Sequence, residues 1–311
     1  MRTRRTNICI LLVAALTAGA VHLHAQGQDT RPSPPRLILQ ITVDQLRGDM
    51  PRSVADRWGQ GGFRTLYEQG VVYENAHHRH ANTETVVGHA TLATGADPAD
   101  HGMIGNIWFD KELGRTVYNI EDDRYTLVGE GGGVDPDVEM DPTQKAAGSD
   151  GRSPANILTT TFSDELALST RGKAKIFGVS VKDRGAVTLA GHAGKAFWFS
   201  KAKGEFVTST YYYDDYPEWV TEWNRRGLPL TYAGTHWELM HDRSTYTHGD
   251  FDDMPWETEL TGYGVVVTHP NRPADRQQIT KHQNDRPAGQ ELNHAVAKVF
   301  IVQEEEGDEE P

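Results

Sequence analysis

Residues 36–43 (RLILQITV) form a nearly continuous apolar run that ends at Asp44. A run of this kind, rich in β-branched residues, is typical of a parallel strand that is buried on both faces. Such strands occur almost only in proteins whose helices cover both faces of the sheet. The run therefore predicts an α/β fold with a mostly parallel sheet and helices on both of its faces.

The chain after this run alternates between helical and strand-like patterns, which supports the same fold class. Apolar spacing and start signals predict helices over residues 62–69, 85–94, 153–169 and 217–226. Residues 71–73, 107–110, 116–120 and 175–181 are predicted as strands, residues 130–151 as a loop and residues 195–213 as a β-rich aromatic segment.

Residues 1–25 have the pattern of a secretory signal peptide. Three arginines precede an apolar stretch over residues 8–21, and a small residue, Ala25, stands at the expected cleavage point. The stretch is shorter than the roughly 20 residues that a membrane-spanning helix needs, so cleavage is favoured over a stable anchor. We expect a periplasmic or secreted protein.

Charge and cysteine content narrow the functional classes. The chain carries 44 acidic and 31 basic residues, so its formal net charge is −13, which argues against a nucleic-acid binder. The single cysteine, Cys9, lies in the predicted signal peptide. The mature protein would therefore have no disulfide, and any metal ion would be held by Asp, Glu or His.

Two residues stand where functional groups collect in α/β proteins. Asp44 follows the predicted strand directly, and its carboxylate is either a metal ligand or the cap of a following helix. Thr85 opens a predicted helix, where it is either an ordinary cap or a hydroxyl facing a bound phosphate. Activating that hydroxyl for attack would require a metal ion or a base nearby.

Three more polar residues follow glycine or strand signals. Asn106 is either a turn residue or an amide donor to an anionic oxygen. Lys182 and Arg184 follow the strand predicted at residues 175–181, and in an extended segment they would point to the same side. The pair could then hold one anion, with the arginine offering a bidentate fork, or it could be two surface cations.

Histidines gather in two places, and these could suggest zinc. One group comprises His77, His78, His80 and His89, and the other comprises His236, His241 and His248. The spacing is irregular and no carboxylate stands at a fixed offset. The pattern favours polar loops beside a site over a histidine-built metal centre.

In combination, these segments resemble the alkaline phosphatase superfamily. The stretches that carry the resemblance are Val43-Asp44, residues 82–95 (NTETVVGHATLATG), residues 101–106 (HGMIGN) and residues 180–186 (SVKDRGA). The match is to the bacterial periplasmic branch with a threonine nucleophile, which is related to type I phosphodiesterase/nucleotide pyrophosphatase domains. The resemblance implies a zinc-dependent phosphomonoesterase.

The resemblance also implies a role for each candidate residue. Thr85 would be the nucleophile, forming a phosphothreonine and contacting zinc, and Asp44 would be a zinc ligand. Asn106 would hold a nonbridging phosphate oxygen. Lys182 and Arg184 would grip the phosphoryl group and favour monoesters over diesters. Two zinc ions per complete active site are implied, with small-molecule phosphate monoesters as substrates and a monomeric protein.

The remaining zinc ligands of this family are not found in the sequence. An Asp-x-x-x-His motif is absent after residue 240, so we expect the chain to be the N-terminal part of such an enzyme, truncated before the metal site is complete. Two alternatives stay open, namely a phosphodiesterase or nucleotide pyrophosphatase, and a noncatalytic fragment that binds phosphate or metal.

The expected organisation follows from these assignments. Residues 1–25 are assigned to the signal peptide, residues 26–35 to a linker, residues 36–303 to the N-terminal part of an alkaline phosphatase-like domain and residues 304–311 to an acidic tail. Within that domain, residues from about 190 to 260 are expected to be a β-rich aromatic insertion.

Overall fold

The computed structural model describes residues 35–137, 139–232, 236–246, 248–251, 254–255 and 269–270. The chain divides into two compact units, residues 1–45 and residues 46–311. The predicted signal peptide, most of the linker and the acidic tail lie outside the described residues. Within the described ranges, no helix has the length and apolar character needed to cross a membrane.

The first unit contradicts one prediction. Residues 36–43 do not form a strand, and side chains such as Leu37 and Ile41 are exposed, at 59% and 64%. A strand needs neighbours for its backbone hydrogen bonds, and no strand in the described ranges pairs with this segment. Asp44 therefore does not lie at the end of a strand here.

In the second unit, the strand predicted at residues 71–73 is also wrong, because this segment has no strand partner in the described ranges.

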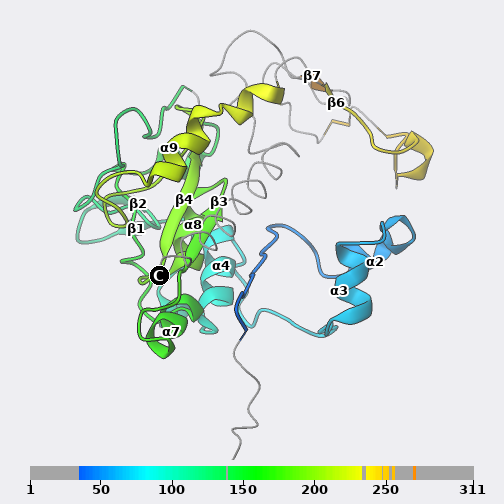
Figure 1. Cartoon of the computed structure of the whole chain (residues 1–311), viewed down its shortest axis with the longest axis horizontal. Helices are drawn as coiled ribbons and strands as arrows, with labels where there is room; N and C mark the ends of the chain where they lie inside the picture. Colours follow the sequence, from blue (N-terminus) through cyan, green and yellow to red (C-terminus); the bar gives the residue numbers. More distant parts are fainter. Residues whose placement is uncertain are drawn as a thin grey trace, which may run out of the picture. The chain divides into compact units, whose positions relative to one another are not determined.

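A three-stranded sheet forms the centre of the second unit (Figure 1). Strand β4 (Lys195–Ser200) lies in the middle, parallel to β3 (Phe177–Ser180) and antiparallel to β5 (Glu205–Val207). Helix α8 (Asp183–Ala190) connects the two parallel strands. The predicted α/β class is confirmed, and the described sheet has one parallel and one antiparallel pair.

Helices cover both faces of this sheet, as predicted. Successive residues of a strand point to opposite faces. Ala196 and Trp198 of β4 belong to a core cluster with α8, whereas Phe197 and Phe199 pack with α9 (Glu218–Arg225). This two-sided burial explains why β4 is apolar at nearly every position.

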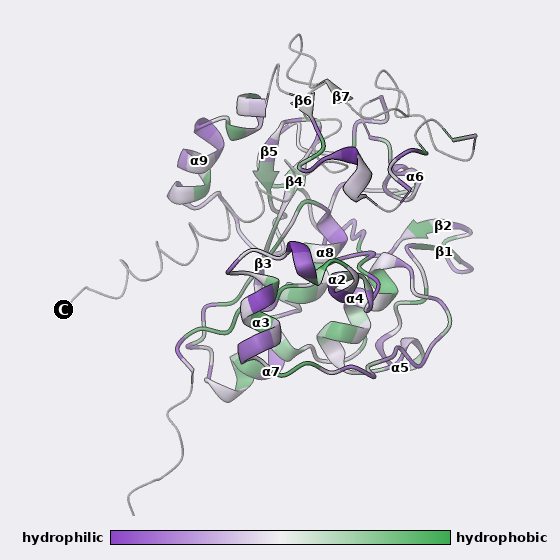
Figure 2. Cartoon of the chain, turned by 90° about the vertical axis from the view of Figure 1, so that its right-hand side faces the viewer, coloured by the Kyte–Doolittle hydropathy of each residue, from purple (hydrophilic) through white to green (hydrophobic). Residues whose placement is uncertain are grey.

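Helix α8 packs closely on strand β3 because Gly178 has no side chain. A Cβ atom at this position would lie 2.3 Å from the carbonyl oxygen of Ala186. Helix α4 (Thr85–Thr94) then packs on α8, and its Val86 and Val87 are fully buried in the shared core. The hydrophobic colouring of α4 and β5 in Figure 2 marks this core.

The described residues form further short helices and strands. They are α2 (Met50–Ser53), α3 (Phe63–Gln69), α5 (Pro98–His101), α6 (Pro142–Lys145), α7 (Phe162–Ser169), β1 (Ile107–Asp110), β2 (Arg115–Tyr118), β6 (His236–Trp237) and β7 (His269–Pro270), with short 3-10 turns at Ala55–Arg57, Leu228–Tyr232 and Arg243–Thr245. Strands β1 and β2 correspond to the strands predicted at residues 107–110 and 116–120, and they pair as an antiparallel hairpin.

One helix starts later than predicted. The pattern at Ser153 indicates a helix start, but α7 begins at Phe162. Thr161 and Asp164 form a reciprocal capping box there, which satisfies the free amides at the helix start. Ser153 instead donates its hydroxyl to Asp122 at 2.5 Å.

Candidate active site

Thr85 is the first residue of α4, and its neighbourhood is built from two loops. Glu84 precedes the helix without capping it by its side chain. The cap comes from another part of the chain, because the amide of Val86 donates to Oδ1 of Asn106 at 3.1 Å. The structure therefore brings Thr85 and Asn106 together at the helix N-terminus.

Hydrogen bonds fix Asn106 on three sides. Its backbone amide donates to Oε2 of Glu84 at 2.5 Å, and its carbonyl oxygen accepts from Nδ2 of Asn119 at 2.6 Å. Because Oδ1 accepts from Val86, the amide nitrogen is left as the outward-facing donor, with no acceptor among the described residues. A donor held beside the positive end of a helix is suited to an anionic oxygen.

Lys182 and Arg184 meet on a single oxygen atom. Nζ of Lys182 and Nη1 of Arg184 both donate to Oδ2 of Asp141, at 2.8 and 3.0 Å. The backbone differs from the prediction, since Lys182 precedes α8 and Arg184 lies in its first turn rather than in an extended segment. The two cations converge on one anionic atom nevertheless.

Asp141 and its surroundings hold the Arg184 guanidinium. Asp141 caps α6 by accepting from the amide of Thr143 at 2.9 Å. The hydroxyls of Thr143 and Tyr118 also lie 3.2 and 3.4 Å from Nη1 of Arg184. Burial would raise the pKa of Asp141, but the charge of Arg184 and the hydrogen bond from Lys182 outweigh it and hold the pKa well below its ordinary value.

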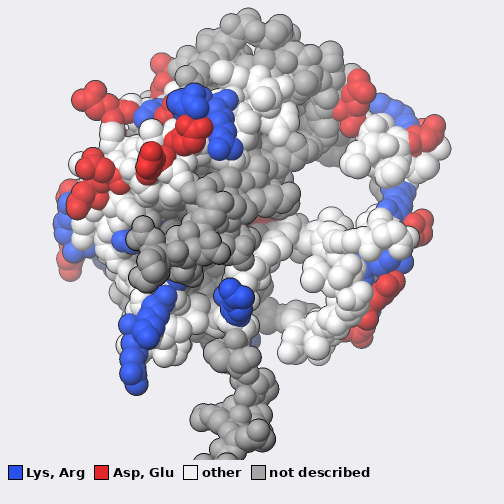
Figure 3. Space-filling model, viewed as in Figure 1, with Lys and Arg blue, Asp and Glu red and all other residues white. Residues whose placement is uncertain are grey.

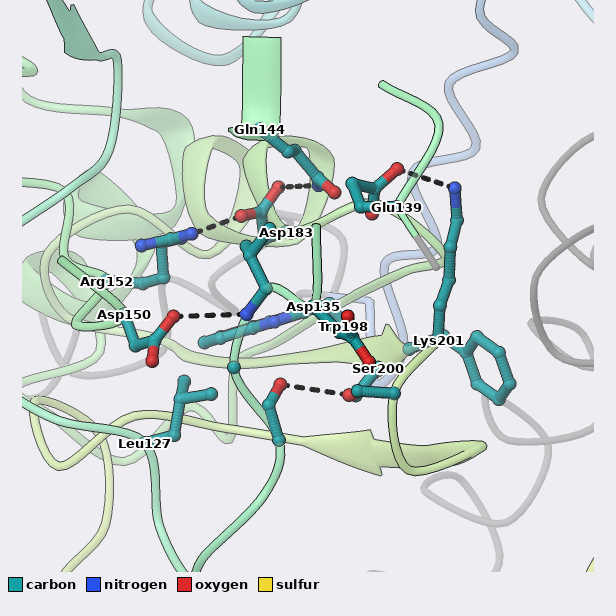
Figure 4. Close-up of a pocket in the computed structure, with 15 residues that line it drawn as sticks. Leu127, Asp135, Glu139, Gln144, Asp150, Arg152, Asp183, Trp198, Ser200 and Lys201 are labelled. Atoms are coloured by element: carbon teal, nitrogen blue, oxygen red, sulfur yellow. Dashed lines mark hydrogen bonds and ion pairs between the residues drawn. The ribbon is translucent and has the colours of Figure 1, made fainter. Parts of the chain in front are cut away.

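Asp183, between the two cations, anchors the start of α8 (Figure 4). Its carboxylate accepts from Nε of Arg152 at 2.7 Å, from the hydroxyl of Tyr118 at 2.7 Å and from Nε2 of Gln144 at 2.8 Å. Burial would raise the pKa of Asp183, but the charge of Arg152 and the Tyr118 hydrogen bond hold it below its ordinary value. Asp183 therefore remains an anion inside the protein.

Sequence reasoning missed Asp141 and Asp183. Asp141 precedes Pro142 and Thr143, a helix-start pattern that could have shown its capping role. Nothing local indicates that it contacts Lys182, which lies 41 positions further along the chain. The only signal for Asp183 is its place between two cations.

A small cavity lies beside Asp183 and Arg152 (Figure 4). Its volume of about 30 Å³ provides room for two or three water molecules, at roughly 10–15 Å³ each. Asp183 and Arg152, which line this cavity, belong to the buried support of α8.

The predicted zinc ligands remain predictions. Asp44 belongs to the first unit and Thr85 to the second. Over the ranges that the structure describes, no three His, Cys, Asp or Glu side chains gather closely enough to hold a metal ion. The described donors therefore do not make up a metal site by themselves.

The face shown in Figure 3 carries charged side chains of both signs. Among the described residues, side chains of opposite charge form ion pairs, such as Arg225 with Glu222 at 2.8 Å and Arg64 with Glu68 at 3.2 Å. Neighbouring acids thus offset the basic side chains of these pairs.

The fold and its similarity to known proteins define the class of protein. The solved crystal structure of the alkaline phosphatase PafA matches with a TM-score of 0.68 and 30% identity, covering 84% of this chain and 48% of that chain. The superfamily is that of the alkaline phosphatases. Within it, the chain belongs to the type I phosphodiesterase/nucleotide pyrophosphatase family, whose model matches residues 38–271.

Two relatives show the extent of the similarity. PafA of Elizabethkingia meningoseptica is 35% identical over 249 residues, which are 80% of this chain and 43% of PafA. The alkaline phosphatase PhoV of Synechococcus elongatus is 34% identical over 266 residues, 82% of this chain and 45% of PhoV. The chain thus spans about half the length of these relatives. A second solved structure is a PafA variant with one threonine changed to serine and an asparagine, a lysine and an arginine changed to alanine.

Proposed function

We propose that this chain supplies the nucleophile and the phosphate-binding groups of an exported phosphomonoesterase. Thr85 attacks the phosphorus atom, and Asn106, Lys182 and Arg184 bind the nonbridging oxygens. The convergence of both cations on one carboxylate oxygen of Asp141 is the observation that carries this proposal. It shows that the two side chains can reach the same anionic atom.

The PafA variant supports the choice of residues. Its four substituted residues are of the same four types as our candidates. Its threonine and asparagine are 21 positions apart, as are Thr85 and Asn106. Its lysine and arginine are two positions apart, as are Lys182 and Arg184.

The charges favour monoesters over diesters. A monoester dianion presents three nonbridging oxygens and a diester monoanion presents two, so the additional charge interacts more strongly with two nearby cations. Asp141 neutralises part of this charge, which leaves the group of three side chains with a net charge of about +1. The buried Nε of Arg184 has no acceptor in the described part of the chain, so this guanidinium has hydrogen-bonding capacity in reserve.

The reaction is a double displacement at phosphorus. The Thr85 hydroxyl loses its proton to solvent as its oxygen bonds to phosphorus, while the ester oxygen leaves with the bonding electrons and takes up a proton. Water then attacks phosphorus and loses a proton, the bond between phosphorus and the Thr85 oxygen breaks, and Thr85 takes up a proton as phosphate is released. The N-terminus of α4 favours the negative charge at this position. Zinc, with Asp44 and Thr85 among its ligands, is part of the proposal by family resemblance only.

The chain by itself is not expected to complete the metal site or to be active alone. Hydrolysis of p-nitrophenyl phosphate and of bis(p-nitrophenyl) phosphate by a protein that carries this chain over the full length of its relatives, with zinc supplied, therefore tests the proposal. We expect faster turnover of the monoester, loss of activity in Thr85→Ala and near-normal activity in Thr94→Ala, a control at the opposite end of α4. Full activity in Thr85→Ala would overturn the assignment. A faster diester reaction would favour the phosphodiesterase alternative, and phosphate binding without turnover would favour the noncatalytic one.

We also propose that residues 1–25 direct export and that the mature protein is a monomer in the periplasm or medium. The basic start and the apolar stretch of this segment support the export proposal. Cell fractionation with and without residues 1–25 tests it. Retention of both forms in the cytoplasm would contradict export, and sedimentation of a stable dimer would contradict the monomer.

A further inference from the structure

Two direct contacts join the turn before Thr85 to the loop that carries Asn106. Nδ2 of Asn82 donates to the carbonyl oxygen of Ile104 at 2.8 Å. Oε2 of Glu84 accepts from the backbone amide of Asn106 at 2.5 Å. The two loops of the candidate site are therefore held together at successive points.

A third connection runs through a threonine between two histidines. Oγ1 of Thr91, on α4, lies 3.0 Å from Nε2 of His80 and 3.1 Å from Nε2 of His101. His80 belongs to the turn before Thr85, and His101 ends α5 just before the Asn106 loop. Thr91 thus links the same two loops through helix α4.

The hydrogen positions along this connection follow from one backbone amide. The amide of Met103 donates to Nδ1 of His101 at 3.1 Å, so Nδ1 carries no hydrogen. His101 is fully buried, and burial lowers its pKa, so the ring is neutral at pH 7. Its hydrogen is then on Nε2 and is donated to the oxygen of Thr91.

The remaining hydrogen bonds, from Thr91 to His80 and from His80 to Asn82, run in the same donor-to-acceptor direction. Nδ1 of His80 lies 2.7 Å from the carbonyl oxygen of Asn82, which can only accept, so Nδ1 carries a hydrogen and donates it. Nε2 of His80 is then the acceptor for the Thr91 hydroxyl. All four hydrogen bonds are satisfied in this arrangement, with the His80 hydrogen on Nδ1 and the His101 hydrogen on Nε2. Both nitrogens of His80 are used, so this ring offers no nitrogen to a metal ion.

We propose that His80, Thr91 and His101 form a positioning relay that holds the Thr85 turn against the Asn106 loop. The inference rests on the proposed function, in which Thr85 attacks phosphorus and Asn106 binds a phosphate oxygen. The three residues act through hydrogen bonds to the backbone of the two loops. They are positioning residues that fix where the nucleophile lies relative to its oxygen-binding partner.

Imidazole ¹⁵N NMR of the wild-type chain at pH 8 tests the hydrogen arrangement. We expect His80 to be protonated on Nδ1 and His101 on Nε2, with His80→Gln and His101→Gln used to assign the signals. Two rings in the same tautomer, or rapid averaging of either ring between tautomers, would overturn the relay.

A matched pair of substitutions tests the positioning role. Thr91→Val keeps the shape of the side chain and removes the hydroxyl, whereas Thr91→Ser keeps the hydroxyl. The amides of Val86 and Asn106 report directly on the junction, because each donates a hydrogen bond across it. We expect their hydrogen exchange to be about tenfold faster in Thr91→Val, and within about twofold of wild type in Thr91→Ser. Equal exchange in both variants would overturn the proposal.

Titration with inorganic phosphate separates this inference from the proposed function. We expect Thr91→Val to bind phosphate more weakly than wild type and Thr91→Ser to bind it normally. If the wild-type chain binds no phosphate, the proposed function fails, while the exchange experiment still decides the relay. If wild type and Thr91→Val bind phosphate equally, the relay does not position the site.

Discussion

The backbone amide of Val86 donates a hydrogen bond to Oδ1 of Asn106 across 20 positions of the chain, at 3.1 Å. This hydrogen bond has one consequence for helix α4 and one for the side chain of Asn106. It satisfies a free amide at the start of α4, and it turns the amide nitrogen of Asn106 outward as a donor. In the proposed function, opposite ends of the same carboxamide would cap the helix and bind the anion.

Two substitutions of Asn106 are expected to separate these tasks. Asn106→Asp keeps an oxygen for Val86 but replaces the outward donor with a second oxygen, so we expect stability near wild type and at least about tenfold weaker phosphate binding. Asn106→Ala removes both, so we also expect a loss of about 0.5–2 kcal/mol in unfolding free energy. Urea unfolding and phosphate titration measure the two effects. Unchanged phosphate binding in Asn106→Asp would exclude this side chain from the site.

Asp183 is expected to be essential to stability. Asp183→Asn leaves Arg152 buried without its counter-charge, and both side chains are only 3% exposed, so we expect a loss of about 3 kcal/mol or more. Glu222→Gln breaks a surface pair with Arg225 and is expected to cost far less. Urea unfolding of both variants makes the comparison. A loss in Asp183→Asn as small as that in Glu222→Gln would refute the anchoring role.

His101 is expected to make stability depend on pH near neutrality. Burial and the neighbouring His80 lower the pKa of His101, while Asp97 and Asp100 act in the opposite direction. Near pH 6.5, His101 therefore binds a proton more readily in the unfolded chain than in the folded chain. The free energy of unfolding decreases as the pH falls through this region.

Thermal unfolding at pH 7.5 and pH 5.5 tests this dependence. We expect His101→Gln to lose less stability on acidification than wild type, and His77→Gln, which changes an exposed histidine, to behave like wild type. An identical pH response in wild type and His101→Gln would show that His101 does not cause the effect.

Two glycines of neighbouring elements are expected to respond in opposite ways to alanine. At Gly178 the added Cβ would meet backbone atoms of α8, so we expect Gly178→Ala to destabilise the protein by about 1–3 kcal/mol. At Gly88, inside α4, no atom lies within 4 Å of the added Cβ, and alanine favours the helix by up to about 1 kcal/mol. Chemical denaturation distinguishes them, and a neutral Gly178→Ala would contradict the close packing of α8 on β3.

The sequence predicts the central part of the fold well because the signals there are local. The apolar pattern before Lys182 gives β3, and the aromatic segment from Lys195 gives β4 and β5. Residues 36–43 show the limit of this reasoning. Their composition is that of a buried strand, yet a strand also needs neighbours to pair with, and composition does not reveal whether they are present.

Local signals also allow part of the candidate site to be predicted from the sequence. Thr85, Asn106, Lys182 and Arg184 lie in motifs that can be read along the chain. Asp141 could not be recognised as the partner of the cations, because the contact depends on how the loop at residues 130–151 folds back. Such long-range polar contacts leave little local pattern.

The central claim is that Lys182 and Arg184 bind a phosphoryl group. Calorimetric titration of the 311-residue chain with inorganic phosphate at low salt tests it most directly. We predict that Lys182→Gln weakens binding by roughly tenfold to a hundredfold, as expected for the loss of one charge-assisted hydrogen bond. Lys203→Gln has the same change in charge at the pair with Glu205, and it is predicted to bind like wild type. Equal affinity of wild type and Lys182→Gln for phosphate would contradict the claim.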